Sequence, residues 1–445
     1  MKRSVAGLLA AMVALSGCLS DGSTTTTAST AATAATSTTM DQGPGFTIPP
    51  PPSRPKPWAV DTTACADAAS ADTEITGTLT IGTTAPQSGG LVTTIYGPVL
   101  AGFRAYVDVA NAQGLLAGVA LELVVADDEG RPELTPVAVS GLLDAGADVV
   151  SALPGSANNL AVRDLLNDAC VPQLMSLARS VRLGEVRQFP WTMGGLVTSV
   201  LETTVYVNTI VRSIDEDATV ALLVSNDDTG TSYARSFLDA AADTDLSIVE
   251  QQLVEPDVVD APARQVLIIA SRQPQVIVAS LSGAACATFL TELDRVRVAL
   301  PGWEPFVYVS SDCADATVLG LAGLAADGVM SSAALVSEDP DFIASMRVLG
   351  ITTGFTRAAD GWTAAEVTVA ILASAQLSPQ GLTRATIINA ARNLAYTPSL
   401  ARPGVEYVTN GVDDAYPVES LQVVRWDATK QMFGDVGALV AQFES

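Results

Sequence analysis

The chain has 445 residues, 48% hydrophobic and only 16% charged, so it can bury one large core or, more readily, two. Its 48 acidic residues outnumber 23 basic ones, and the net charge of −25 argues against binding to nucleic-acid phosphates or anionic lipid surfaces. The sequence contains no histidine, which excludes a Ser-His-Asp triad, and we expect no catalytic residue, metal or cofactor.

Residues 1–18 have the features of an export signal. Lys2 and Arg3 are followed by the apolar stretch Val5–Leu15, which is shorter than the roughly 20 residues that a membrane-spanning helix needs. The tetrapeptide Leu-Ser-Gly-Cys that ends at Cys18 resembles a bacterial lipobox. We therefore expect cleavage before Cys18 and attachment of lipid to it; a plain cleaved signal with an incidental cysteine is the alternative.

Residues 19–72 are predicted to be a disordered linker. The composition is clearest from Ser20 to Pro57, where a Thr/Ser/Ala tract is followed by Gly-Pro-Gly and the prolines Pro49–Pro52. Such a segment cannot bury a core and stays extended. It is suited to tether a folded domain to a lipid anchor.

The stretch after the linker predicts a strand, a loop, a helix and a second strand. Thr78–Thr84 is rich in β-branched residues, and the turn formers that follow it begin a loop over Pro86–Tyr96. Apolar residues recur at helical spacing from Pro98, and Leu121–Ala126 is a nearly continuous apolar strand. Strands that are apolar on both faces are typical of a parallel sheet covered by helices, where ligands bind beyond the carboxyl ends of the strands.

The same alternation continues and begins a second series after Gly195, which indicates an α/β fold with two Rossmann-like lobes. Further strands are predicted at Ala147–Ala152, Val171–Ser176, Thr219–Val224, Ser247–Val254, Val276–Ala279 and Phe306–Ser310. Asp127 and Asp128 end one strand, and we interpret them as solvated turn residues because adjacent side chains face opposite ways.

Four cysteines remain beyond Cys18, and an even number in an exported chain suggests disulfides. Cys286 and Cys313 each follow a predicted strand, and these strand ends would be close if the strands are neighbours. We therefore favour the pairs Cys286–Cys313 and Cys65–Cys170. Free buried thiols are the alternative.

The segments TIGTTAPQSGG (80–90), AYVDVANAQG (105–114) and ELVVADDEGRP (122–132) resemble the start of a type I periplasmic solute-binding protein of the branched-chain amino acid (Leu/Ile/Val)-binding branch of ABC importers. This resemblance implies two lobes joined by a hinge of several segments. It places the first lobe at 73–196 plus about 327–400, with the chain returning near Gly328. The second lobe would comprise 197–326 plus about 401–445, with the chain crossing back near Pro403.

The resemblance also implies a site for a ligand carboxylate. In the family, a hydroxyl residue at a strand-to-helix turn holds the carboxylate, which places Ser156 and the adjacent Ala157 in this role. Ser156 as a simple helix cap is the alternative. The turn after the next strand carries a second hydroxyl residue in the family, but Ala178 occupies that position here. Ser176, Arg179 and Ser180 are the candidate substitutes, and Arg179 would favour an acid. A solvated loop charge is the alternative for Arg179, and the sequence favours it slightly.

Four more residues are carried over from the family, and a fifth, Ser282, is a candidate because it lies in a loop after a strand. Asp312 matches the acidic residue that meets a ligand ammonium, with a helix cap as the alternative. Tyr96 matches an aromatic of the first loop, with surface packing as the alternative, and Thr229 replaces another aromatic. Ser282 follows a strand in the second lobe. Trp362 matches a family aromatic, with core packing as the alternative.

The sequence therefore predicts a lipoprotein that binds an amino acid or related small carboxylate by hinge closure and delivers it to ABC permease subunits. We expect a monomer, lipid-anchored at the outer face of the cytoplasmic membrane or in the periplasm, and touching the membrane only through its lipid. A ligand-sensing receptor or regulator with the same fold, not coupled to transport, is the alternative. An exported hydrolase is disfavoured because the chain has no Gly-x-Ser-x-Gly motif.

Overall fold

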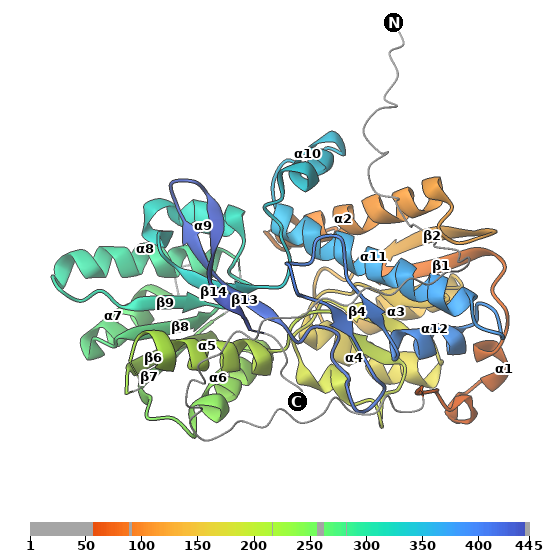
Figure 1. Cartoon of the computed structure of the whole chain (residues 1–445), viewed down its shortest axis with the longest axis horizontal. Coiled ribbons are helices and arrows are strands. Elements are labelled where there is room, and N and C mark those ends of the chain that lie inside the picture. The colour runs from red at the N-terminus through yellow and green to blue at the C-terminus, as the bar shows by residue number, and fades with distance from the viewer. Residues whose placement is uncertain (1–56, 89–90, 216, 256–261, 282, 441–445) are drawn as a thin grey trace, which may run out of the picture. The chain divides into compact units, whose positions relative to one another are not determined.

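The computed structural model describes residues 57–88, 91–215, 217–255, 262–281 and 283–440. The predicted signal, Cys18, the linker up to residue 56 and Ser282 lie outside these ranges. Within them, two α/β lobes each contain a sheet covered by helices (Figure 1). The predicted fold class is confirmed.

The first lobe is built on a parallel sheet in the order β2-β1-β3-β4-β5. Leu79, Ile81, Val149 and Val150 are fully buried because helices cover both faces of this sheet. The strands are β1 (Gly77–Thr84), β2 (Val119–Ala126), β3 (Val149–Ser151), β4 (Gln173–Ser176) and β5 (Thr192–Gly194). The helices are α2 (Leu91–Gln113), α3 (Thr135–Asp144), α4 (Ser156–Asp168), α11 (Phe355–Gln376) and α12 (Arg384–Ala391).

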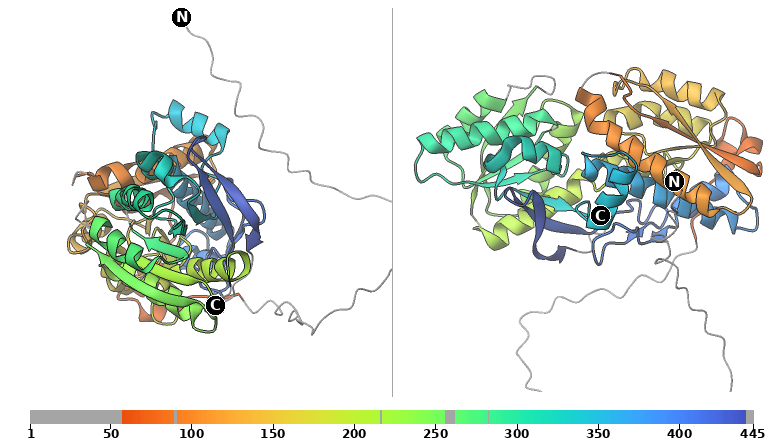
Figure 2. Two further views of the ribbon diagram at one scale, coloured as in Figure 1. Left: turned by 90° about the vertical axis from the view of Figure 1, so that its left-hand side faces the viewer. Right: turned by 90° about the horizontal axis from the view of Figure 1, so that it is seen from above.

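The second lobe contains a mixed sheet in the order β14-β13-β10-β9-β8-β6-β7. The β13–β14 hairpin (dark blue in Figure 2) forms one edge, and β13 pairs antiparallel with β10. The strands are β6 (Thr219–Ser225), β7 (Ser247–Val254), β8 (Val276–Ser280), β9 (Phe306–Val309), β10 (Met330–Ala333), β13 (Leu421–Asp427) and β14 (Met432–Val440). The helices are α5 (Ser199–Ser213), α6 (Asp228–Ala241), α7 (Pro262–Arg272), α8 (Ala284–Ala299) and α9 (Ala316–Ala322).

The chain passes between the lobes after β5, after β10 and before β13. Both later crossings lie further along the chain than predicted. Strand β10 pairs with β9 and β13, so residues 330–333 belong to the second sheet, although 327–400 was assigned to the first lobe. After α10 (Pro340–Val348), α11 and α12, the small β11–β12 pair (Ala395–Tyr396 and Tyr407–Val408) follows. Tyr416 beyond it still donates from its hydroxyl to the carbonyl of Val181 in the first lobe, 2.6 Å away.

Helix α2 begins at Leu91 and contains Pro98, so the predicted loop over Pro86–Tyr96 is shorter and Tyr96 lies on a helix. Tertiary packing explains this difference. Helices α2 and α11 lie side by side, and a Cβ on Gly102 or on Gly361 would overlap a carbonyl of the other helix. The close contact between the helices offsets the backbone hydrogen bond that an internal proline removes.

The predicted linker also ends earlier than residue 72. The backbone N–H groups of Trp58 and Val60 donate to Asn393 (3.0 Å) and Asn389 (2.7 Å) of the α12 region. The short helices η1 (Thr62–Ala64) and α1 (Ala68–Ala71) follow. This segment is therefore bonded to the first lobe, through the two asparagines at Trp58 and Val60 and through the Ala66 backbone N–H, which donates to the Asp168 carbonyl at 3.0 Å.

Asp128 is fully buried, which corrects its interpretation as a solvated residue. Its carboxylate accepts hydrogen bonds from the hydroxyls of Thr84 and Thr135, both at 2.9 Å, and from Asn158 at 3.2 Å. These bonds connect β1, α3 and α4. Only the neighbouring Asp127 is exposed.

The structure contains the disulfides Cys65–Cys170 and Cys286–Cys313, the pairing that the sequence favours. Their Cα atoms are 5.6 and 5.8 Å apart. Strands β8 and β9 are neighbours in the second sheet, as the second pairing assumed.

Candidate ligand-binding site

Arg179 and Asp312 form an ion pair that joins the two lobes. Arg179 follows β4 of the first lobe, Asp312 follows β9 of the second, and Nε of the arginine lies 3.1 Å from Oδ1 of the aspartate. Both residues come directly after the carboxyl ends of parallel strands, where open α/β sheets bind ligands. The pair therefore marks a candidate site between the lobes.

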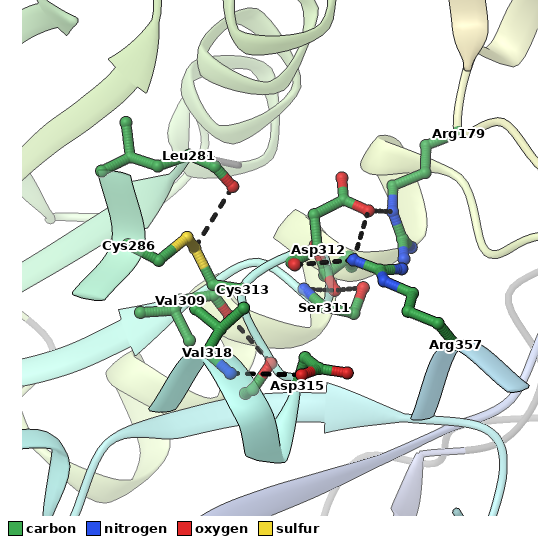
Figure 3. Close-up of a disulfide and its surroundings, with 12 residues drawn as sticks. Arg179, Leu281, Cys286, Val309, Ser311, Asp312, Cys313, Asp315, Val318 and Arg357 are labelled. Carbon is green, nitrogen blue, oxygen red and sulfur yellow. Dashed lines mark hydrogen bonds and ion pairs between the residues drawn. A yellow bond between two sulfur atoms is a disulfide. The ribbon is translucent and has the colours of Figure 1, made fainter. Parts of the chain in front are cut away.

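Arg357 of α11 is a second cation beside Asp312 (Figure 3). Its Nη2 lies 3.9 Å from Oδ1 of Asp312 and donates to the backbone carbonyl of Asp312 at 2.7 Å. Its Nη1 donates to Asp360, one turn further along α11, at 3.3 Å. Two arginines and one aspartate of the first lobe thus surround one aspartate of the second.

The pKa values of the Asp312 and Asp360 carboxyl groups are shifted in opposite directions. Burial alone would raise the pKa of Asp312, but the charges of Arg179 and Arg357 lower it below its ordinary value. Burial raises the pKa of Asp360, and Arg357 offsets this only in part. Burial would lower the pKa of Arg179, but Asp312 and Glu202 raise it, so the guanidinium stays charged.

Ser156 lies at the first position of α4, preceded by Gly155. Gly155 has a φ of +92°, and a Cβ there would lie only 2.7 Å from Asn158 Oδ1, so the turn requires glycine. The hydroxyl oxygen of Ser156 accepts a hydrogen bond from the Arg179 backbone N–H at 3.3 Å and keeps its own proton for donation. The structure thus brings Ser156 together with Arg179, and Ala157 follows in the first turn, where helices bind anions.

The turn after β4 contains Ser176 and Ala178. Ser176 is fully buried, and its hydroxyl has no hydrogen-bond partner in the part of the chain that the structure describes. The backbone N–H of Ala178 donates to the Ser176 carbonyl at 2.8 Å and is therefore not free for a ligand in this state. Arg179 is the residue of this turn whose side chain reaches Asp312.

The remaining predicted residues lie in different surroundings. Tyr96 lines a small cavity of about 10 Å³ with Thr84, Ala152 and Pro154. Burial raises the pKa of its hydroxyl, and the charge of Arg357 opposes this shift. Thr229 is partly buried in the first turn of α6.

Trp362 belongs to an aromatic cluster of the first lobe. Its ring centroid lies 5.0 Å from that of Tyr106 and 6.0 Å from that of Phe342, with edge-to-face geometry. Core packing accounts for its position.

A cavity of about 70 Å³ adjoins the charged cluster. Its walls include Arg179 and Asp360 of the first lobe and Ser311 of the second. Much of the rest comes from residues at or next to the points where the chain passes between the lobes. These are Gly195, Leu196 and Val197 after β5, Ser332 and Ala333 in β10, Ala334 and Leu335 after it, Val418 before β13, and Leu421 at the start of β13. No helix among the described residues is long and apolar enough to cross a membrane, and no group of three or more acidic or cysteine side chains there could hold a metal ion.

A family model for periplasmic binding proteins matches residues 78–431, which is most of the chain. The chain belongs to this family. No curated protein matches its sequence.

Solved binding proteins share the fold of this periplasmic binding protein at low sequence identity. A branched-chain amino acid ABC transporter protein from Thermus thermophilus with bound valine has a TM-score of 0.72 and 18% identity, over 82% of this chain and 97% of that one. A solute-binding protein from Rhodopseudomonas palustris in complex with 3,4-dihydroxybenzoic acid has a TM-score of 0.69 and 17% identity, over 83% and 98% of the two chains. A fatty acid ABC transporter substrate-binding protein from Thermomonospora curvata has a TM-score of 0.68 and 16% identity, over 84% and 95%.

Sequence reasoning missed three charged residues of this periplasmic binding protein: Arg357, Asp360 and Glu202. Glu202 is fully buried in the first turn of α5, and its Oε1 accepts bonds from the Ser311 backbone N–H at 3.0 Å and the Ser332 hydroxyl at 2.7 Å. A signal for Glu202 was present, because it lies on the same helix face as the apolar residues Val205 and Tyr206. A carboxylate on an otherwise apolar face indicates a buried polar partner.

Proposed function

We propose that this periplasmic binding protein captures an amino acid or a related small carboxylate between its lobes for an ABC importer. The observation that supports this most is the pairing of Arg179 with Asp312 across the two lobes, beside the hydroxyl of Ser156. A zwitterion carries the two charges complementary to that pair. Entering between them, it replaces one ion pair with two and leaves the local net charge unchanged.

The ligand carboxylate is assigned to the first lobe. The Arg179 guanidinium offers a bidentate contact, the Ser156 hydroxyl offers a proton, and the first turn of α4 offers backbone N–H groups. The ligand ammonium is assigned to Asp312 of the second lobe, whose lowered pKa keeps it charged at neutral pH. A ligand held from both lobes favours the closed arrangement, and no bond of the ligand is broken.

Two of the solved relatives support this ligand class, because their bound molecules, valine and 3,4-dihydroxybenzoic acid, are both carboxylic acids. The family is one of extracytoplasmic binding proteins, in keeping with delivery to a permease. We extend the proposal to a monomer anchored by lipid on Cys18, with the residues before Trp58 as tether. The lipobox-like sequence before Cys18 supports this anchor.

The test begins with a thermal-shift screen of amino acids and small carboxylates, followed by calorimetric titration of matched compounds. Valine, 3-methylbutanoate and 2-methylpropan-1-amine form one such series, since the second lacks the ammonium and the third lacks the carboxylate. We expect the compounds that retain a carboxylate to bind and the amine not to bind. Arg179→Met should abolish binding of every carboxylate.

Arg163→Met is the matched control. Arg163 is also a buried arginine of the first lobe and pairs with Glu185 at 2.8 Å, but it lies outside the candidate site. It should lower stability by an amount similar to Arg179→Met and leave ligand affinity unchanged. Binding of no carboxylate, or equal affinity of wild type and Arg179→Met, would overturn the proposal.

A further inference from the structure

The segment that carries Asp312 is a short connection between β9 and α9, residues 310–315, here termed the Asp312 loop. Its first residue is bonded to the sheet, because the Ser310 backbone N–H donates to the carbonyl of Ala279 in β8 at 2.8 Å. At its other end, the Asp315 carboxylate caps α9 by accepting from the N–H groups of Thr317 (2.8 Å) and Val318 (3.2 Å). Between these ends, the Cys313 backbone N–H donates to the Ser310 carbonyl and the Asp315 N–H to the Cys313 carbonyl, both at 2.8 Å.

Both chain neighbours of Asp312 are fixed (Figure 3). Cys313, on one side, is joined by a disulfide to Cys286 in the first turn of α8, and both cysteines are fully buried. Ser311, on the other side, is bonded through its backbone N–H to the buried carboxylate of Glu202 at 3.0 Å. The disulfide therefore ties the Asp312 loop to the helix that follows β8.

Asp312 itself faces the other lobe. Its side chain is 27% exposed, and its ion pairs run to Arg179 and Arg357, both of the first lobe. Arg357 also holds its backbone carbonyl from the first lobe at 2.7 Å, so the contacts that attach Asp312 to its own lobe are those of its chain neighbours. A carboxylate held in place before binding avoids the ordering cost that a mobile one would incur on meeting a ligand.

We propose that the Cys286–Cys313 disulfide is a positioning element of the binding site: it holds the Asp312 loop where the carboxylate meets the first lobe and the ligand. The predicted effect of the disulfide on ligand affinity rests on the proposed function, whereas its predicted effect on the Asp312 loop is independent of that function. The other disulfide has no such position, since Cys170 precedes β4 and so lies at the amino end of a strand, away from Ser176 and Arg179.

The experiment compares Cys286→Ala/Cys313→Ala with the control Cys65→Ala/Cys170→Ala. Amide hydrogen exchange of the ligand-free chain tests the loop: at Thr317 and Val318 we expect exchange at least about tenfold faster in the first variant and unchanged in the control. The pair Cys286→Ser/Cys313→Ser is measured alongside, in case the alanine pair fails to fold.

Calorimetry with valine and 3-methylbutanoate tests the effect on the ligand. The affinity for valine should fall about tenfold in the first variant. The affinity for 3-methylbutanoate should fall less, because this compound lacks the ammonium that is assigned to Asp312. In the Asp312→Asn background, removal of the disulfide should not lower the affinity for valine any further. A general loss of stability would lower the affinity in both backgrounds.

Unchanged exchange in residues 311–318 would overturn the proposal, as would an equal loss of affinity in the control. If neither probe binds to the wild-type protein, the proposed function fails for these probes, and the exchange measurement alone decides whether the disulfide positions the loop.

Discussion

The two disulfides join very different regions. Cys65–Cys170 links residues 105 apart and fastens the segment before β1 to the first lobe, at the amino end of β4. Cys286–Cys313 links residues only 27 apart, at the carboxyl ends of β8 and β9, next to Asp312. One disulfide thus closes a long loop far from the candidate site, and the other closes a short loop beside it. A cross-link that matters most for stability need not be the one that matters most for binding.

The largest expected effect comes from the long loop. In the chain-entropy model, closing a loop of that length stabilises the fold by about 5 kcal/mol, against about 3.5 kcal/mol for the short loop. Cys65→Ala/Cys170→Ala should therefore lower the free energy of unfolding more than Cys286→Ala/Cys313→Ala does. Denaturant titration of both variants measures the difference. A larger loss of unfolding free energy in Cys286→Ala/Cys313→Ala would contradict this prediction.

Removing the charge of Asp312 should have the next largest effect. Asp312→Asn leaves Arg179 and Arg357 without their shared partner and should cost about 2 kcal/mol of stability, since its side chain is only 27% exposed. The matched control is Asp435→Asn, because Asp435 also pairs with a buried arginine, Arg402, but is itself 57% exposed. The control should cost less than about 1 kcal/mol by denaturant titration. Equal losses would show that Asp312 is an ordinary surface partner.

Ser156→Ala should reduce ligand affinity without a large loss of stability. Its hydroxyl accepts from the Arg179 backbone N–H at 3.3 Å, its one hydrogen bond to the described residues, and is assigned to the ligand carboxylate. Loss of one such bond costs about 1 kcal/mol, or roughly fivefold in Kd. Calorimetry with the best carboxylate from the screen measures it. Ser140→Ala, on the exposed side of α3, is the control and should bind as wild type does.

The smallest effect concerns pH. The folded state raises the pKa of Asp360 above 3.8, so its folded form holds a proton more tightly than the unfolded chain does. The associated stability is present below about pH 4 and is lost as pH rises through the raised pKa. Stability of wild type relative to Asp360→Asn should therefore fall as pH rises from about 4 to 7. Denaturant titrations across this range test the sign, and a relative stability that rises with pH would contradict it.

Much of the fold could be predicted because buried parallel strands are short apolar runs. Strand β6 is one example: six of its seven residues are buried, and the predicted strand Thr219–Val224 lies within its bounds, Thr219–Ser225. The start of α2 could not be predicted, because a proline in such a pattern indicates the first turn of a helix. The position of Pro98 inside the helix depends on contact with α11, which lies more than 250 residues later in the chain. The crossings were misplaced because short connecting segments have no periodicity.

The candidate site could be predicted only in part. Ser156 and Asp312 follow strands and could be assigned from the resemblance. Arg357 and Asp360 are spaced like an ordinary surface pair on one helix, and only the approach of the second lobe makes them neighbours of Asp312. Trp362 shows the converse, since a matching aromatic lies in a packed cluster of its own lobe.

The central claim is that a carboxylate ligand is held between Arg179 and Asp312 from opposite lobes. A crystal structure of the complex with the best ligand from the screen tests it most directly. We predict that the carboxylate lies within hydrogen-bond distance of the Arg179 guanidinium and the Ser156 hydroxyl, with the rest of the ligand against the Asp312 loop. A ligand bound to one lobe alone, with the Arg179–Asp312 pair intact and untouched, would contradict the account.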